Sequence, residues 1–194
     1  METNERIEKV NTMYLLGNIF IPVFAAIVIN VFGALFLGNF GAILGTAAMM
    51  GALLWWAVIG KSVYDKGKEK TLAELEKSGF TRNHTFNGDG CTVVVDIKQG
   101  KVALLFRWNP GKVYIRPASA LSRVHTEDGK TGSGIMEGSA RVRFCFVVEQ
   151  IRVNVNTFTS NQRWPMDSEH ILTGISKADM MVETLVAAGA QAGK

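Results

Sequence analysis

The chain lacks charge over a long stretch near its N-terminus, where Asp, Glu, Lys and Arg are all absent between Lys9 and Lys61. A gap of roughly 50 residues is long enough for two membrane-spanning helices of about 20 residues each. The residues before the gap are slightly acidic, and the apolar run far exceeds the core of about 7 to 15 residues in a cleaved signal peptide. The absence of charge therefore predicts a membrane anchor that is not cleaved.

Motifs of catalysis and nucleotide binding are missing as well. No GxxxxGK[ST] or GxGxxG sequence follows a predicted strand, which argues against ATP use. His84, His125 and His170 occur singly, without the spacing of metal ligands, and Cys91 and Cys145 have no cysteine-rich surroundings. We interpret the histidines as surface or edge residues and the cysteines as small, reduced hydrophobic residues. We therefore predict no enzyme, catalytic residue, metal site or cofactor.

The uncharged stretch is interrupted over residues 37–41, where two glycines and an asparagine offer turn chemistry. This predicts a hairpin of two transmembrane helices over about 13–36 and 41–60. Lys and Arg lie only on its outer flanks, at Arg6 and Lys9 and again from Lys61 to Lys70. The bias of positive charge toward the cytoplasm predicts a multi-pass protein with both termini cytoplasmic. An exported C-terminal domain is the alternative, and it would place four lysines outside.

Small residues recur on one face of the second predicted helix, at Gly41, Gly45, Ala48 and Ala52. Such a face allows close helix packing, either against the first helix of the same chain or between subunits. Both interpretations stay open. We expect homo-oligomers through this face.

The rest of the chain has ordinary charge content and alternating apolar and polar residues. Residues 1–12 form a short cytoplasmic N-terminus, and 61–79 continue the second helix as a stalk that Gly79 ends. Residues 80–194 are long enough for one soluble domain. Glycine-marked turns divide its first part into about seven predicted strands, at 80–86, 91–97, 101–108, 112–116, 121–126, 142–148 and 151–158.

Three of the predicted turns lie at Gln99-Gly100, Asn109-Pro110-Gly111 and Glu149-Gln150. A loose, glycine-rich stretch over 129–139 separates the fifth strand from the sixth. At the end of the chain, Ser176 and Asp179 have the spacing of a capping box, which predicts a helix over about 176–188. The fold class is a membrane helical hairpin joined to a mainly-β domain with a C-terminal helix.

This order resembles the pleckstrin-homology-like (PH-like) superfold, a bent antiparallel sheet or barrel of about seven strands closed by a C-terminal helix. The segments that carry the resemblance are FNGDGCTVVVDIKQGKVALLF, KVYIRPASALSRVHTEDG and RVRFCFVVEQIRVNVNTF. Together with the hairpin they look like bacterial membrane proteins of unknown function that have two helices and a PH-like domain. The resemblance implies a bacterial inner membrane.

A second resemblance is to the two-helix, β-barrel membrane effectors of bacterial cyclic-oligonucleotide antiphage systems, which share the length and domain order. It implies that a nucleotide bound in the barrel promotes oligomerisation of the hairpins and disruption of the membrane. No nucleotide-contacting residue can be transferred from these effectors to a position of this chain.

Basic residues of the domain suggest anionic partners. Candidate positions for contacts with a ligand or with lipid headgroups lie at the predicted turns and on the polar face of the last hairpin: Lys98, Lys101, Lys112, Arg116, Arg141, Arg143 and Arg152. A solvated face would explain the same pattern. Nucleic acid is not expected, because acidic residues are interleaved with the basic ones and no stacking-aromatic motif is visible.

The sequence therefore predicts a membrane-anchored, non-enzymatic interaction or assembly module whose domain binds a protein partner or an anionic ligand. The alternatives are a ligand-gated, membrane-disrupting effector and a structural subunit of a larger envelope assembly. The sequence does not choose between them.

Overall fold

A computed structural model describes residues 6–88, 90–130 and 138–192. The chain divides into two compact units. One consists of residues 8–72 and 108–111, and the other of residues 1–7, 73–107 and 112–194. The second unit thus begins before the predicted domain start at residue 80 and leaves out the segment 108–111.

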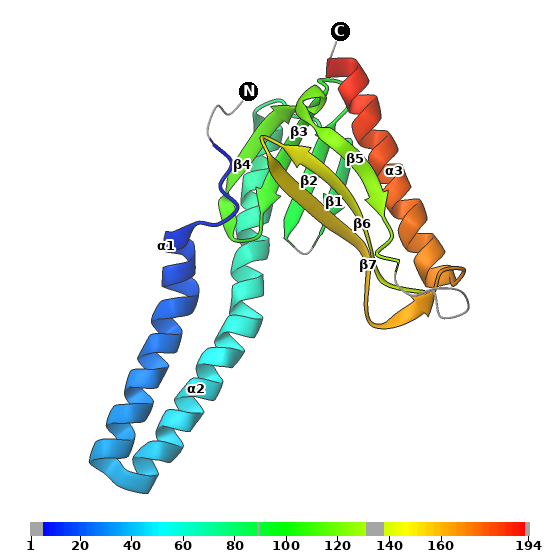
Figure 1. Cartoon of the computed structure of the whole chain (residues 1–194). Helices are drawn as coiled ribbons and strands as arrows, with labels where there is room; N and C mark the ends of the chain where they lie inside the picture. The colour runs from blue at the N-terminus through cyan, green and yellow to red at the C-terminus, as the bar shows by residue number, and fades with distance from the viewer. Residues whose placement is uncertain (1–5, 89, 131–137, 193–194) are drawn as a thin grey trace. The chain divides into compact units, whose positions relative to one another are not determined.

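The first unit is built from helices α1 (Thr12–Leu15) and α2 (Ile21–Lys77), joined by the short π-helical segment η1 (Leu16–Phe20). Gly38, with φ 56° and ψ −136°, interrupts α2 and reverses the chain, so that α2 contains both arms of a hairpin (Figure 1). A positive φ of this kind suits glycine, because glycine has no Cβ atom to clash with the backbone. The break at Gly38 thus lies within residues 37–41, where the sequence predicted the hairpin turn.

The two arms pack closely at glycines. A Cβ atom added to Gly41 would stand 1.7 Å from the Gly33 carbonyl oxygen, and one added to Gly45 would stand 2.3 Å from the Asn30 Cα atom. Gly41 and Gly45 are buried, and Ala48 and Ala52 are half-buried. The predicted small-residue face therefore packs, at its two glycines, against the first arm of the same chain.

Thr12–Gly41 is long and apolar enough to cross a membrane, and its large side chains are mostly exposed. The described residues contain no second helix that meets this criterion, because the apolar stretch Ile43–Leu54 is shorter. Beyond it, α2 continues as one helix to Lys77. Gly79 follows with φ 86°.

The first unit also includes the segment 108–111, where the sequence predicted a turn. Instead, Asn109 begins strand β4 (Asn109–Pro117). The Asn11 amide donates to the Trp108 carbonyl at 2.9 Å, and the Thr71 hydroxyl donates to the Pro110 carbonyl at 3.0 Å. These hydrogen bonds hold the segment extended. Pro110 is tolerated there because β4 is an edge strand of its sheet.

The second unit contains two antiparallel sheets and a C-terminal helix, which confirms a helix-plus-β organisation (Figure 1). Strands β1 (His84–Asn87), β2 (Cys91–Asp96), β3 (Lys101–Phe106) and β4 form one sheet in that order. Strands β5 (Ser122–Glu127), β6 (Gly138–Val148) and β7 (Ile151–Pro165) form the other. The predicted first strand is shorter than expected and begins at His84. Much of the predicted loose stretch, 131–137, lies outside the described residues.

The tight turns follow the predicted positions. Gly100, with φ 61°, lies in the turn between β2 and β3. Glu149 and Gln150 both have positive φ, 49° and 66°, and they connect β6 to β7 directly after the Val148–Ile151 pair. Two-residue hairpin turns favour positive φ at both central residues, because the twist of such a turn matches the twist of the two strands that it connects.

Side chains from both sheets meet in one core. Along β6, Val142, Phe144, Phe146 and Val148 point into it, while Arg143 and Cys145 lie on the other face, as the alternation predicts. The core also includes buried side chains of the other elements, among them Val93, Val95, Val102, Leu104, Tyr114, Val153, Val155, Ile171, Ala178 and Leu185.

Helix α3 (Glu169–Ala192) closes the core and contacts β5, β6 and β7 (Figure 1). The predicted start at a capping box of Ser176 and Asp179 is wrong, because both residues lie inside the helix. Ile171 and Gly174, in the additional first turns, are buried. Burial against the sheet therefore extends the helix toward its N-terminus, an effect of tertiary packing that a local capping pattern does not report.

Candidate functional site

The outer face of the β5–β6–β7 sheet carries a group of polar side chains centred on Glu127. Antiparallel pairing places His125 of β5 opposite Cys145 of β6, and Glu127 opposite Arg143. His125 and Glu127 are two residues apart on one strand, so they share a face. Arg152 reaches the same place from β7. The sheet register therefore brings together residues that are distant in the sequence.

A bulge in β5 precedes the group. The pairing of β5 with β6 shifts between Ser122 and His125, and Arg123 has φ 52°, an uncommon value for a residue with a side chain. The His125 Nδ1 atom lies 2.7 Å from the Arg123 carbonyl oxygen. Because a carbonyl only accepts, Nδ1 carries the proton in this contact, and Nε2 of the neutral ring keeps its lone pair.

Glu127 is held by two arginines and one thiol. Arg143 donates in a fork, from Nε to Oε2 at 3.0 Å and from Nη2 to Oε1 at 2.7 Å. Arg152 Nη2 donates to Oε2 at 2.5 Å, and Cys145 Sγ donates to the same oxygen at 3.2 Å. The hydrogen bonds from Arg143 are the main reason that the pKa of Glu127 falls to about 2. The carboxylate is therefore ionised at neutral pH.

Cys145 is buried beneath these side chains. Removal from water raises the pKa of its thiol, because burial disfavours the thiolate, and the Arg152 guanidinium opposes that effect only in part. The thiol therefore stays protonated and donates to Glu127. A protonated, buried thiol is a poor nucleophile.

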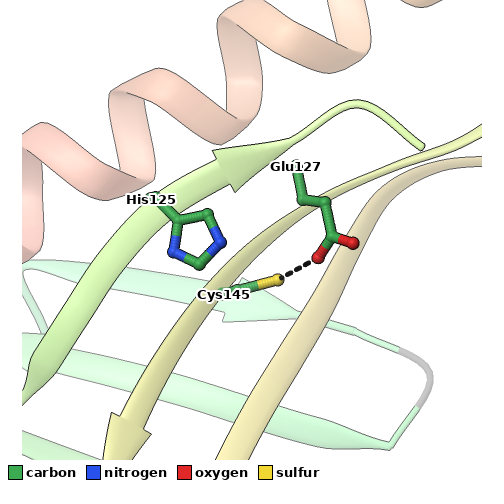
Figure 2. Close-up of side chains that lie close together, drawn as sticks. All are labelled: His125, Glu127 and Cys145. Carbon is green, nitrogen blue, oxygen red and sulfur yellow. Dashed lines mark hydrogen bonds between the residues drawn. The ribbon is translucent and has the colours of Figure 1, made fainter. Parts of the chain in front are cut away.

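His125, Glu127 and Cys145 converge closely enough to share a metal ion. One ligand atom from each lies within 4.8 Å of those of the other two (Figure 2). Imidazole nitrogen, carboxylate oxygen and thiolate sulfur are the three ligand types that zinc sites use. A surface hollow of about 130 Å³ lies beside the group, and Arg123, His125, Cys145 and Arg152 line part of it.

Sequence reasoning missed this group, because it treated His125 and Cys145 as isolated residues. The local signal is the His125-x-Glu127 spacing, which places both side chains on one face of a strand. The strand predicted over 121–126 stopped one residue short of Glu127, whereas β5 includes it. The contribution of Cys145 depends on the register between β5 and β6. His84 and His170 lie elsewhere and stack on Phe86 and Phe158, and the described residues show no further metal-type group.

The predicted ligand-contacting basic residues are distributed over several elements. Arg143 and Arg152 meet at Glu127, whereas Arg116 is buried and pairs with Glu149. The other four are Lys98 and Lys101 around the β2–β3 turn, Lys112 on β4 and Arg141 on β6. Lys98, Lys112 and Arg141 are exposed, and Lys101 donates to Gln99 at 3.3 Å.

Comparisons with protein-family models, with curated proteins and with solved structures gave no match for this chain.

Proposed function

We propose that the chain is a membrane-anchored, non-enzymatic interaction module, in which the apolar hairpin holds the β domain at a bilayer. One observation carries this proposal: the exposed large apolar side chains are concentrated between Met13 and Leu54. A soluble unit would bury such side chains, whereas a lipid-embedded one exposes them to acyl chains.

The proposed topology is a two-pass hairpin over residues 13–60 in the inner membrane of a bacterium, with both termini in the cytoplasm. The break at Gly38 and the close approach of Gly33 to Gly41 support two adjacent arms. The lysines that follow the second arm, from Lys61 to Lys70, favour the cytoplasmic side.

The proposed fold of the domain is PH-like. Its support is a four-stranded and a three-stranded antiparallel sheet whose side chains share one core, together with a C-terminal helix that packs on the second sheet. We infer that such a domain, held at a bilayer, serves to bind a protein partner or an anionic ligand. The fold class does not select the partner, because function resides in sites rather than in folds.

The small-residue face supports an assembly role over a ligand-gated effector, because the effector requires the hairpins of different subunits to associate. Gly41 and Gly45 contact Gly33 and Asn30 of the same chain, so the surface best suited to close helix association between subunits is occupied within one chain.

The anchor is tested by alkaline carbonate extraction of membranes from cells that express the full chain, and the topology by C-terminal fusions to green fluorescent protein and alkaline phosphatase. We expect the protein to stay in the membrane and only the fluorescent fusion to be active. Release by carbonate would contradict the anchor, and phosphatase activity would contradict the topology.

The interaction role is tested by native mass spectrometry after mild solubilisation. A stoichiometric protein partner without a small ligand would support the module. A homo-oligomer that carries a nucleotide-sized adduct would contradict it and support the effector.

A further inference from the structure

The environment of His125, Glu127 and Cys145 holds these ligands in orientations that suit a cation. The hydrogen bond from His125 Nδ1 to the Arg123 carbonyl leaves Nε2 as the metal-binding nitrogen. Arg143 fixes the Glu127 carboxylate with one hydrogen bond to each of its two oxygens. Metal-binding imidazoles and carboxylates are commonly oriented in this way by hydrogen bonds from outside the ligand set.

A positive group already contacts two of the three ligands. Arg152 Nη2 is 2.5 Å from Glu127 Oε2 and 3.7 Å from Cys145 Sγ. Its side chain is 52 % exposed, so it can move away into solvent without opening the core. The guanidinium therefore contacts the same oxygen and sulfur atoms that a bound ion would bridge.

We propose that His125, Glu127 and Cys145 form a binding site for a divalent transition-metal ion of the zinc class, and that the Arg152 guanidinium holds the place of this ion in the metal-free protein. Binding displaces the guanidinium and replaces the thiol proton of Cys145, which is released to solvent. The ion forms one bond to each of Nε2, a carboxylate oxygen and Sγ.

The ligand types select the metal. Magnesium and calcium prefer oxygen ligands, whereas a set of one nitrogen, one sulfur and one oxygen suits zinc, cobalt or a similar ion. Zinc bonds of about 2.0 to 2.3 Å require ligand atoms roughly 3 to 4 Å apart. Cys145 Sγ and Glu127 Oε2, at 3.2 Å, already meet this requirement, and the His125 ring is exposed and lines the adjacent hollow.

Arg152 distinguishes a metal site from an anion site. A metal ion competes with the guanidinium, so removing Arg152 strengthens metal binding. An anion bound in the adjacent hollow uses the guanidinium as a partner, so removing Arg152 weakens anion binding.

The experiment titrates the full-length, reduced protein in detergent with Co²⁺ and follows the thiolate charge-transfer and visible ligand-field bands, and then displaces Co²⁺ with Zn²⁺. We expect one ion per chain and sulfur-to-cobalt absorption. Cys145→Ser should abolish that absorption, His125→Ala should weaken binding at least tenfold, and Arg152→Ala should strengthen it about tenfold. Cys91→Ser is the matched control, because Cys91 lies in the other sheet, and it should leave the spectrum unchanged.

Absence of sulfur-to-cobalt absorption from both the wild-type protein and Arg152→Ala would overturn the proposal. Absorption that persists in Cys145→Ser would overturn it too. Weaker Co²⁺ binding by Arg152→Ala than by the wild-type protein would also overturn it. So would a protein that does not bind Co²⁺ but binds inorganic phosphate in a way that depends on Arg152. If Cys145→Ser does not fold, the exposed His125→Ala and Arg152→Ala variants keep the test decisive, because their expected effects have opposite signs.

Discussion

Gly174 of α3 lies so close to Phe158 of β7 that a Cβ atom added to the glycine would stand 2.8 Å from the Phe158 Cβ atom. Val142 of β6 is also near, with its Cβ atom 3.3 Å from that position. The Thr157 hydroxyl donates to the Gly174 carbonyl at 2.8 Å. The missing side chain at Gly174 therefore sets how closely α3 approaches the β6–β7 hairpin, and hence how the core is closed.

Gly174→Ala should destabilise the protein by about 1 to 3 kcal/mol, because the added methyl group overpacks a filled contact. Gly189→Ala is the matched control in the same helix, where the nearest atom would be 3.7 Å away. It should stabilise the helix by up to about 1 kcal/mol through propensity alone. Denaturant titration of the full chain in detergent measures both, and equal effects of the two variants would contradict this account.

In the hairpin, Gly45→Ala should lower the thermal stability of the detergent-solubilised protein, because the new Cβ atom would stand 2.3 Å from the Asn30 Cα atom. Gly51→Ala, where an added Cβ atom meets nothing within 4 Å, should have no such effect. Loss of an oligomer in Gly45→Ala with unchanged stability would instead place this face between subunits.

Asp96→Asn should destabilise the β domain by about 1 to 3 kcal/mol, because two backbone donors depend on the carboxylate. Asp96 is fully buried, and its oxygens accept from the Thr81 amide at 2.7 Å and the Gln99 amide at 3.0 Å. The asparagine NH₂ group would face one of these donors. The exposed Asp167→Asn is the control, and denaturant titration that finds the two variants equal would contradict the role of Asp96.

Features of the fold that depend on local chemistry were predictable from the sequence. The alternation of Val142, Phe144 and Phe146 with Arg143 and Cys145 predicted which face of β6 is buried, because the side-chain period of a strand is two. Turn residues likewise located the break near Gly38 and the β6–β7 turn. These features need no knowledge of what packs against them.

Features that depend on distant partners were not predictable in this way. Ile171 and Gly174 extend α3 because Ile171 is buried in the core and Gly174 packs against β6 and β7, and a capping pattern at Ser176 contains no information about that burial. The pairing of His125 with Cys145 requires the register of β5 against β6, which the bulge at Arg123 changes. The candidate site was therefore missed, although its His-x-Glu spacing was visible.

The ion pair between Arg116 and Glu149 should make stability depend on pH. The hydrogen bond from Arg116, whose side chain is only 9 % exposed, lowers the pKa of Glu149. A carboxyl group whose pKa is lower in the folded state stabilises the fold fully above its unfolded pKa of about 4.3. That contribution is lost as the pH falls through the lower, folded-state pKa.

Glu149→Gln, which mimics the protonated carboxyl group, should therefore be less stable than the wild-type protein at neutral pH, and the difference should shrink as the pH falls below about 4.3. Denaturant midpoints of the full chain, measured at a series of pH values, give this difference. In an Arg116→Met background, Glu149→Gln should produce a much smaller pH-dependent difference, because the guanidinium that most favours the ionised carboxylate is gone and only the Ile7 backbone hydrogen bond remains. A difference that grows on acidification, or that persists unchanged in the Arg116→Met background, would show that Glu149 stabilises the β6–β7 turn by some means other than this ion pair.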